Sequence, residues 1–586
     1  MKRCPTCDRA ETDDALTFCR IDGTPLVRES GPVSEGAGTL KLGSALVVGD
    51  TETRILPQAG AASTEETLST PTAQTTVLDG RRASGGTQEL SKPKSRKRVV
   101  IAVAAIILAA LTASAYIYFS RGKSSAANNS VAVLPFVNAG GDSDLEYLSD
   151  GMTESLINSL SQLPNVRVMA RTTMFSFKGK DTDPRAIGKQ LGVETVLTGR
   201  VVKRGDRLTI QADMVNVSDG SQMWGEQYNR QVSDLLAVQT EIAREIVGKL
   251  RLKLSGEEHR RLTRRYTDNA EAYQLYLRGR YHWNKRDAEE MKKGVGYFNQ
   301  AVALDPSFAL AYAGLADSYA LLPFYAGTEP AEDFTKAKAA ATRALEIDDA
   351  LAEAHATFAH VKMWHEWDWA GAEREFKRAV ELNPNYPTAH HWYALCLSFL
   401  ASHQEALAEI RRAHELDPFS LGINLDMGVV YLNARQYDEA IKHFQRANEM
   451  NADFLQAHLF LAESYEVKGM YEEAAKELEK VITLSGGRAE AAAPLRSGYR
   501  ASGERGYFQE KLKLLMQRWQ RSGKGAYQIA EVHASLGEED QAFGWLEKSY
   551  ERHDLSLVNL KVTPRLDPLR TDPRFKDLLR RVGLPQ

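Results

Sequence analysis

The sequence predicts a multidomain chain of five parts: a small cysteine-rich unit, a disordered linker, a single transmembrane helix, an α/β domain and an all-α superhelical solenoid. Three observations lead to this fold class. The length of 586 residues is more than one hydrophobic core can organise. Residues 99–119 contain no charged side chain, as a membrane-spanning helix requires. In the carboxy-terminal half, Pro384 and Pro418 close similar apolar helices 34 residues apart, which indicates a helical repeat.

The first part, residues 1–28, carries three of the four cysteines. Cys4 and Cys7 form a CxxC pair, and Cys19 and Asp22 follow on a second short turn. Thiolates favour Zn²⁺ and a structural zinc site needs four ligands, so Asp22 is the expected fourth ligand. The segment resembles a zinc ribbon in which Asp22 stands where the family has a fourth cysteine. The resemblance implies one structural zinc ion held by Cys4, Cys7, Cys19 and Asp22, and a metal-free or redox-active thiol cluster is the alternative.

Residues 29–95 form the predicted disordered cytoplasmic linker. They are rich in Ser, Thr, Gly, Ala and Glu, contain no aromatic side chain and show no lasting helical or strand period. Three threonines, Thr39, Thr53 and Thr75, each precede an aliphatic residue by three positions. A phosphothreonine-reading domain could recognise this spacing, and chance spacing in a Thr-rich linker is the alternative.

The predicted transmembrane helix with its basic flank covers residues 96–121. At about 1.5 Å per residue, the uncharged run from Val99 to Phe119 reaches roughly 30 Å, which matches the hydrocarbon core of a bilayer. Basic residues crowd its amino-terminal side, so the positive-inside rule places the amino terminus in the cytoplasm. For a bacterial chain this predicts a single-pass protein of the inner (cytoplasmic) membrane, with the residues after about 121 extracytoplasmic. A buried helix of a soluble domain is the alternative.

Residues 129–257 are predicted to form the α/β domain. Apolar, β-branched runs and helical patterns follow one another there, separated by turn sequences such as Ser218-Asp219-Gly220. The expected strands are 130–136, 166–169, 195–202, 208–217 and one that ends near Trp224, and the expected helices are 149–163, 184–191 and 233–254.

This α/β domain resembles the TolB amino-terminal-like domain in the stretches VAVLPF, EYLSDGMTESLINSL, VRVMARTTMFSFKGK, LGVETVLTGRV and DGSQMWGEQYNR. The resemblance implies a non-catalytic extracytoplasmic module. Gly140-Gly141 after the first strand lacks both a GxGxxG pattern and a phosphate-binding lysine. The sequence also offers no nucleophile–base pair or paired carboxylates on one folded site, so we expect no enzyme, no cofactor besides zinc and no small-molecule substrate.

From residue 265 to 586 the chain is almost wholly helix-forming. The phrases AVALDP, AVELNP and AHELDP each end an apolar helix, and small and large side chains such as Gly428 and Phe444 fall at regular positions. This pattern resembles the tetratricopeptide repeat (TPR), and the resemblance implies stacked helical hairpins around one continuous core. Repeats begin near residues 270, 307, 350, 385, 419 and 453, with degenerate repeats near 488 and 526. The end of the chain, from Leu566 on, resembles the capping tail of such arrays.

By repeat position, the first helix of each hairpin lines the concave face of the array. The predicted partner-binding groove on that face carries His391, Trp392, Asp426, Asn433, Glu463 and Glu466. TPR domains that clamp a terminal carboxylate carry Lys and Asn at these positions, so the acidic side chains here favour a cationic or neutral extended segment. For any one of these residues, packing or surface solvation is the alternative.

Two further clusters lie on the predicted repeats. His360, His365, His390 and His391 could bind a metal ion, although histidines are common in helical arrays. The tryptophans of WHEWDW, within residues 364–369, either anchor a partner or pack a turn.

Together these features favour a non-enzymatic, membrane-anchored scaffold or adaptor that binds a protein or peptide partner through the concave face of its array. The alternative is a membrane-bound transcription or signalling regulator with a cytoplasmic zinc-ribbon effector and an extracytoplasmic sensor region. Nucleic acid is not an expected partner. The net charge of −3 provides no attracting field, and the first thirty residues carry few basic side chains and one aromatic residue, Phe18.

Overall fold

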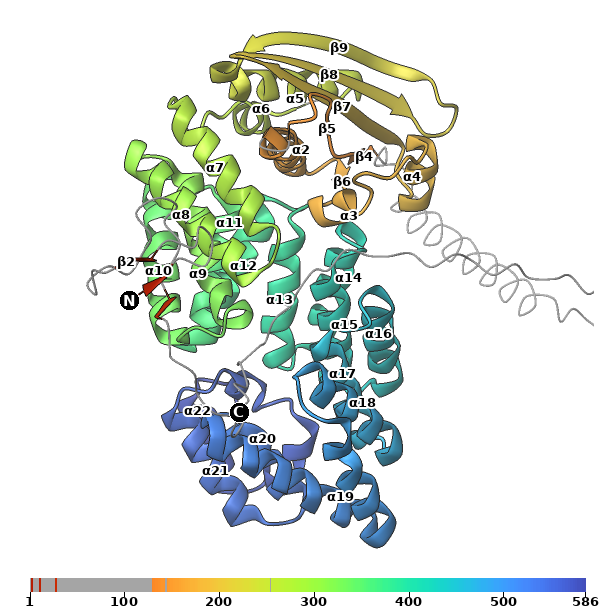
Figure 1. The fold of residues 1–586 in the computed structure, drawn as a ribbon, viewed down its shortest axis with the longest axis vertical. Helices are drawn as coiled ribbons and strands as arrows, with labels where there is room; N and C mark the ends of the chain where they lie inside the picture. The colour runs from red at the N-terminus through yellow and green to blue at the C-terminus, as the bar shows by residue number, and fades with distance from the viewer. Residues whose placement is uncertain (1, 4–9, 12–26, 29–128, 143–144, 253) are drawn as a thin grey trace, which may run out of the picture. The chain divides into compact units, whose positions relative to one another are not determined.

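The computed structural model describes residues 2–3, 10–11, 27–28, 129–142, 145–252 and 254–586 (Figure 1). The predicted zinc ligands, the linker threonines and the predicted transmembrane helix all lie outside these residues. No helix in the described part of the chain combines the length and the apolar character that crossing a bilayer needs.

The chain divides into a unit of Met1–Ser44 and a unit of Ala45–Gln586. In the first unit, three short strands form an antiparallel sheet in the order β2-β1-β3. These strands are β1 (Lys2–Arg3), β2 (Ala10–Glu11) and β3 (Val27–Arg28).

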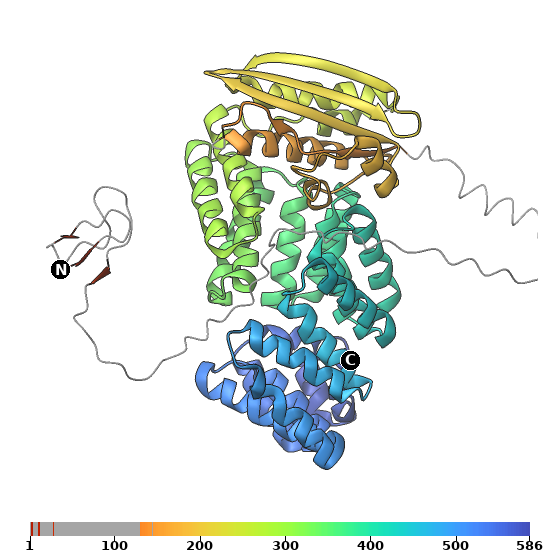
Figure 2. The same ribbon diagram turned by 45° about the vertical axis from the view of Figure 1, so that its right-hand side comes forward.

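The described part of the second unit begins with a six-stranded mixed sheet. Its strands are β4 (Ser130–Val133), β5 (Val137–Asn138), β6 (Arg167–Val168), β7 (Thr195–Arg204), β8 (Arg207–Asn216) and β9 (Gln222–Gln231). They run in the order β6-β4-β7-β8-β9, and β5 pairs with β7. β4 is parallel to β6 and β7, whereas β7, β8 and β9 form an antiparallel meander. Helices α2 (Glu146–Ser161) and α5 (Leu235–Lys249) cover one face of the sheet in both views (Figures 1 and 2).

Side-chain alternation along β8 explains why only one face is covered. Leu208, Ile210 and Met214 are buried, whereas Gln211 between them is exposed, as expected where one face of a sheet packs on a core. Helix α4 (Pro184–Leu191) spans the residues predicted for it, and β7 and β8 agree with prediction to within two residues. The last strand differs, because β9 continues beyond Trp224 to Gln231 to pair along the whole of β8. The short helix α3 (Arg171–Phe175) lies in a stretch for which no helix is predicted.

Helical hairpins make up most of the described chain after the sheet, which confirms the predicted solenoid (Figure 2). After α6 (Gly256–Leu262), the paired helices are α7 (Ala270–Trp283) with α8 (Ala288–Leu304), α9 (Ala309–Tyr325) with α10 (Pro330–Ile347), α11 (Ala352–Val361) with α12 (Trp369–Leu382), α13 (Pro387–Phe399) with α14 (His403–Leu416), α15 (Leu421–Asn433) with α16 (Tyr437–Met450), and α17 (Leu455–Val467) with α18 (Tyr471–Leu484). The remaining helices are α19 (Ala493–Ser522), α20 (Ala526–Ser535), α21 (Glu539–Glu551) and α22 (Pro573–Arg581).

Two of these helices depart from a regular hairpin. A π-helical turn (Lys362–Glu366) follows α11 and ends at Trp367, which has the left-handed φ of 53°. Helix α19 breaks at Ser502 and Gly503, within the repeat predicted to be degenerate. Both features interrupt the regular helical hydrogen bonding.

The core between hairpins is built from the predicted small and large positions. Ala440, Phe444 and Ala447 of α16 are fully buried. Gly428 of α15 faces the ring of Phe444 so closely that an added Cβ would lie 2.4 Å from the ring atom Cε1. The small residue therefore sets the distance between the two helices of this hairpin.

Replacing Gly428 with alanine is expected to destabilise the protein by about 1–3 kcal/mol, because the new methyl group must push Phe444 out of its packed position. The measurement is urea unfolding followed by the helical circular dichroism signal. Gly544→Ala is the matched control, since an added Cβ at Gly544 in α21 meets no atom within 4 Å. Equal unfolding midpoints for the two variants would contradict the packing role of Gly428.

The α/β domain is attached to the array through the turns between repeats. Asn383 and Asp417 occupy the same turn position of consecutive repeats, 34 residues apart. Asn383 donates a hydrogen bond to Oγ of Ser161 at 2.9 Å. Asp417 accepts hydrogen bonds from Oγ1 of Thr173 at 2.6 Å and from its backbone N–H at 2.9 Å. The polar side chains at this turn position of two repeats thus also bind α2 and α3 of the α/β domain.

The carboxy-terminal tail, residues 554–586, folds back onto earlier repeats. Nε1 of Trp369 donates to the carbonyl of Val582 at 2.9 Å, and His553, directly before the tail, stacks on the Trp367 ring with centroids 3.9 Å apart. The tail buries Leu557, Leu560, Leu566, Leu569 and Phe575 in the same hydrophobic cluster as Trp369. A simple cap would cover only the last hairpin, so this tail goes beyond the expected role.

Candidate partner-binding groove

The six residues of the predicted groove lie on three consecutive first helices, α13, α15 and α17, and most of them contact other residues of the chain. Nε2 of His391 lies 2.7 Å from Oδ2 of Asp426, which joins α13 to α15. Nδ2 of Asn433 donates to Oγ of Ser398 at 2.9 Å. The ring of Trp392 packs against His360, with centroids 4.5 Å apart.

Glu466 on α17 is the centre of a buried ionic cluster. Nζ of Lys511 lies 2.7 and 2.8 Å from its two carboxylate oxygens, and the hydroxyl of Tyr507 donates to it at 2.6 Å. Arg565 of the tail also forms an ion pair with Glu466. Burial opposes ionisation of Glu466, but Arg565 and Lys511 outweigh it and lower its pKa. The carboxylate is therefore charged and already neutralised from within the chain.

Glu463 and Glu531 lie beside this cluster, but there the nearby bases do not outweigh the effect of burial on the carboxyl pKa. Burial raises the pKa of both carboxyl groups, and the nearby charge of Glu463 helps to raise that of Glu531 to about 8. Arg565 acts in the opposite direction on both. The interior around α17, α19 and α20 thus holds three acids for two bases, and at neutral pH a proton offsets part of the excess negative charge.

The groove positions therefore differ in what they could offer a partner. The side chains of His391 and Asp426 are 13% and 22% exposed, whereas that of Glu466 is fully buried. A partner group could reach the His391–Asp426 pair without moving the tail. Reaching Glu466 would require breaking its contacts with Arg565, Lys511 and Tyr507.

The other predicted clusters are built into the core of the array. His360 is buried among aromatic rings, and this desolvation lowers its pKa to about 3. His390 lies 2.5 Å from Glu409 and belongs to a different contact network. Across the described residues, no group of three or more His, Cys, Asp or Glu side chains is placed to hold a metal ion. Cys396 is also fully buried, as expected for a small apolar side chain.

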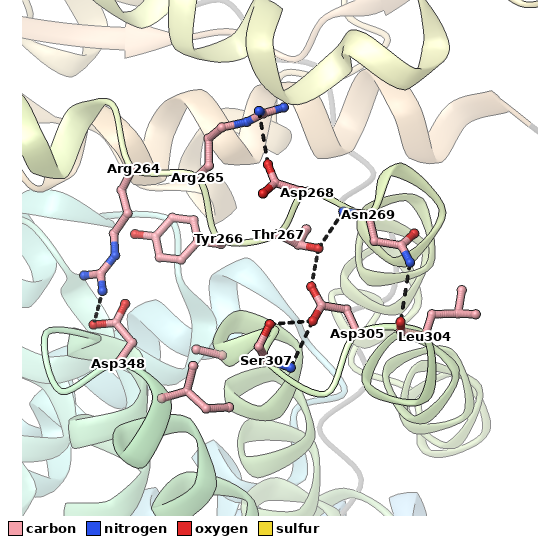
Figure 3. A pocket seen from close by; sticks show the side chains of 12 residues that line it. Arg264, Arg265, Tyr266, Thr267, Asp268, Asn269, Leu304, Asp305, Ser307 and Asp348 are labelled. Atoms are coloured by element: carbon pink, nitrogen blue, oxygen red, sulfur yellow. Dashed lines mark hydrogen bonds and ion pairs between the residues drawn. The ribbon is translucent and has the colours of Figure 1, made fainter.

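A pocket of about 670 Å³ lies where the α/β domain joins the first two repeats (Figure 3). Its wall is the segment 264–269, and its other side consists of the turns at 304–309 and 347–348. Arg264 pairs with Asp348 at 2.7 Å, and Arg265 pairs with Asp268 at 3.1 Å. Sequence reasoning missed this pocket, because it is formed by turns from three separate elements that share no motif.

Comparison with known families gives two matches. Residues 127–245 match the HilA/YgeH-like transcriptional regulator, second domain, and residues 431–495 match the tetratricopeptide repeat. The second match confirms the predicted repeats, so the chain contains TPRs. The first match covers most of the α/β domain, and its family name differs from the TolB amino-terminal-like domain that the sequence resembles. The TolB-like assignment therefore stays a prediction.

One curated relative is "Putative adenylate cyclase 3" of Rhizobium meliloti (strain 1021). It is 37% identical over 242 residues, which are 41% of this chain and 41% of that protein. The chain thus covers less than half the length of this relative.

Two solved structures show more distant similarity. YrrB, a TPR protein with an unusual peptide-binding site, is 22% identical with a TM-score of 0.23, covering 32% of this chain and 89% of that chain. A human IFIT1 dimer with PPP-AAAA is 15% identical with a TM-score of 0.36, covering 69% and 94%.

Proposed function

We propose that this chain is a non-enzymatic, membrane-anchored scaffold or adaptor of bacterial signalling, whose TPR array binds a protein or peptide partner. The observation that carries the proposal is the stack of TPR hairpins from α7 to α18. Such stacks present a long, rigid surface to another polypeptide, because each hairpin contacts only its neighbours and leaves one face uncovered.

Within the groove, we place the first contact at the His391–Asp426 pair. These two side chains keep some exposure, whereas Glu466 is fully buried and already paired with Lys511 and with Arg565 of the tail. The Asp426 carboxylate can accept hydrogen bonds on its second oxygen, which suits a cationic or amide-rich extended segment. This fits the partner class expected from the acidic groove positions.

The anchor and the zinc ribbon complete the proposal. A single helix at 96–121 would hold the array outside the cytoplasm, and a ribbon with Cys4, Cys7, Cys19 and Asp22 would bind structural zinc inside. Protease protection of residues 129–586 in sealed inner-membrane vesicles tests the orientation. Zinc content of the purified chain, compared with that of a Cys4→Ser variant, tests the ribbon.

A membrane-bound transcription or signalling regulator is the second candidate. The match of residues 127–245 to the second domain of a HilA/YgeH-like transcriptional regulator favours it, and so does the cyclase name of the curated relative. A regulator acting on DNA should bind duplex DNA with an affinity that falls steeply as salt rises. If the zinc-loaded chain does not bind duplex DNA at low salt, the DNA-binding form of this candidate is refuted.

Crosslinking in intact membranes tests the scaffold proposal. We expect Asp426→Ala to lower recovery of the partner roughly tenfold, as removal of a central contact in an interface often does. Lys442→Ala on the outer helix α16, where the side chain is 65% exposed, is the matched control. Equal recovery of the partner with both variants would show that the partner binds at another surface of the chain. Failure of the wild-type chain to capture any protein would refute the scaffold itself.

A further inference from the structure

Strand β9 forms one edge of the mixed sheet. Its ten residues, Gln222–Gln231, pair with β8 along their length, and no other strand in the described part of the chain pairs with them. Figure 1 shows β9 as the outermost strand, beside β8. A strand at the edge of a sheet presents unpaired N–H and C=O groups, which are a template for a strand of another chain.

The outward-facing backbone groups of β9 can be assigned from its register. Val232 continues the pairing of β9 with β8 and donates its N–H to the carbonyl of Asp206 at 2.9 Å. The direction of hydrogen bonding alternates along a strand, so the even-numbered residues of β9 face β8. The odd-numbered residues Gly225, Gln227 and Asn229 therefore direct their backbone groups away from the sheet.

Two of the features that commonly protect an edge strand are missing from residues 225–231. This segment contains no proline and no lysine. The bulge of the β8–β9 pair lies outside it, at Met214 and Val215, whose partners on β9 are Trp224 and Gln222. Residues 225–231 are therefore a regular strand that can pair with another strand without interruption.

We propose that two copies of the chain associate by antiparallel pairing of their β9 strands around a two-fold axis at Tyr228. In this register Glu226 of each copy lies opposite Arg230 of the other copy, so two cross-strand pairs of opposite charge form. An axis at Glu226 or at Arg230 would place like charges opposite one another, which is unfavourable. An axis at Gln227 or at Asn229 would leave both charges opposite uncharged residues. Charge complementarity thus selects one register, with a second copy of the chain as the occupant of the edge.

Both charged side chains are accessible at this edge. Glu226 is exposed and forms no hydrogen bond or ion pair within the described residues. Arg230 is 42% exposed, and its two Nη atoms lie 3.2 Å from the carboxylate of Glu241 on α5 and 3.2 Å from the carbonyl of Asn229. Exposed contacts of this kind contribute little, so Arg230 can leave the carbonyl for Glu226 of the second copy. The freed carbonyl can then accept from the N–H of Gln227 in that copy.

Backbone hydrogen bonds supply the rest of the contact. In this register Gln227 is opposite Asn229 and Gly225 is opposite Gln231, which gives about eight N–H···O=C bonds between the two copies. The N–H of Gln231 lies 3.4 Å from the carboxylate of Asp234, so its own chain holds it only weakly. The association is a property of the α/β domain and does not depend on what the TPR array binds.

Reversing the charges one at a time tests the pairing. Two differently tagged copies of the full-length chain are expressed together, and one tag is used to isolate them. We expect Glu226→Arg in both copies, or Arg230→Glu in both copies, to lower recovery of the second tag about tenfold, because like charges then face each other. A Glu226→Arg copy expressed with an Arg230→Glu copy should recover the association, since every cross-strand pair again joins opposite charges.

Arg207→Glu is the matched control, because it makes the same change of charge at an exposed position of β8, away from the edge. Recovery of the second tag should be unchanged in this variant. Wild-type copies that do not co-isolate would overturn the proposal, and so would single-charge variants that co-isolate as well as wild type. Failure of the mixed pair to restore recovery would overturn it too, because the register predicts this rescue.

A disulfide tests the register independently. Opposed side chains of an antiparallel pair have Cβ atoms within about 5.5 Å, so cysteines there can join with little movement. A Glu226→Cys copy and an Arg230→Cys copy should form a dimer linked through these two positions, which mass spectrometry of the peptides identifies. Two Glu226→Cys copies should not be linked there, because in this register the two cysteines are about 13 Å apart along the strands. Equal linkage in the two mixtures would overturn the proposal.

Discussion

Replacing Arg565 with leucine should destabilise the carboxy-terminal part of the array by about 3–5 kcal/mol, because the change leaves buried acids without their main counter-charge. The side chains of Arg565 and Glu466 are 7% and 0% exposed, so water cannot take over the lost contact. Lys511 alone would then face Glu463, Glu466 and Glu531. Urea unfolding of the full-length chain, with hydrogen exchange of α17 as a local readout, measures the loss.

The pH dependence of this variant distinguishes an electrostatic cause from lost packing. Carboxyl groups with raised pKa values stabilise the folded state while protonated, and that contribution disappears as pH rises through the folded value. For Glu531 this window runs from its ordinary 4.5 to about 8. The defect of Arg565→Leu should therefore be largest above neutral pH and should shrink as the pH falls toward 4.5.

Arg574→Leu is the matched control for Arg565→Leu. Arg574 also belongs to the tail and pairs with Asp540 and Asp572, but its side chain is 46% exposed. Its loss should leave the unfolding midpoint almost unchanged, since exposed ion pairs contribute little. A pH-independent defect in Arg565→Leu would show that packing of the arginine side chain, and not its charge, stabilises the contact between the tail and α17.

The repeat fold could be predicted because its information is local. Turn residues such as Pro384 and Pro418 mark the end of each hairpin, and the small and large positions, such as Gly428 and Phe444, lie close together in sequence. The same holds for the α/β domain, where strand and helix periods locate β7, β8 and α4. Patterns of this kind recur within a few residues, so they can be recognised without knowledge of the tertiary structure.

The groove was harder to predict, because its contacts are distant in sequence. Repeat position correctly places Glu466 on a first helix, but it contains no information on Lys511 or Arg565, which lie 45 and 99 residues away. Likewise, the bond of Thr173 to Asp417 joins residues 244 positions apart. Period and composition indicate which face of a helix is inward, and they do not reveal which other segment will cover it.

Asn385 is the residue whose replacement should most weaken the attachment of the α/β domain. Its Nδ2 lies 3.0, 3.1 and 2.8 Å from the carbonyls of Ser161, Leu163 and Val166, and its Oδ1 accepts from Arg412 at 3.0 Å. Ser161 is the last residue of α2, so an amide from the array caps a helix of the other domain. We expect Asn385→Leu to cost about 3–5 kcal/mol, because several buried polar groups lose their partner at once.

Loss of this cap should act on a defined segment. Amides of residues 161–168 should exchange faster in Asn385→Leu, and thermal unfolding should separate into a transition of the α/β domain and a later one of the array. Asn229→Leu is the control, since the exposed side chain of Asn229 on β9 only accepts a hydrogen bond from the hydroxyl of Thr209 on β8 and its loss should not affect the docking of the two domains. The repeat turn would then have two separable roles, closing its own hairpin and fastening a neighbouring domain. A single cooperative transition with unchanged midpoint in Asn385→Leu would mean that apolar packing of α2 on α7 is sufficient to hold the two domains together.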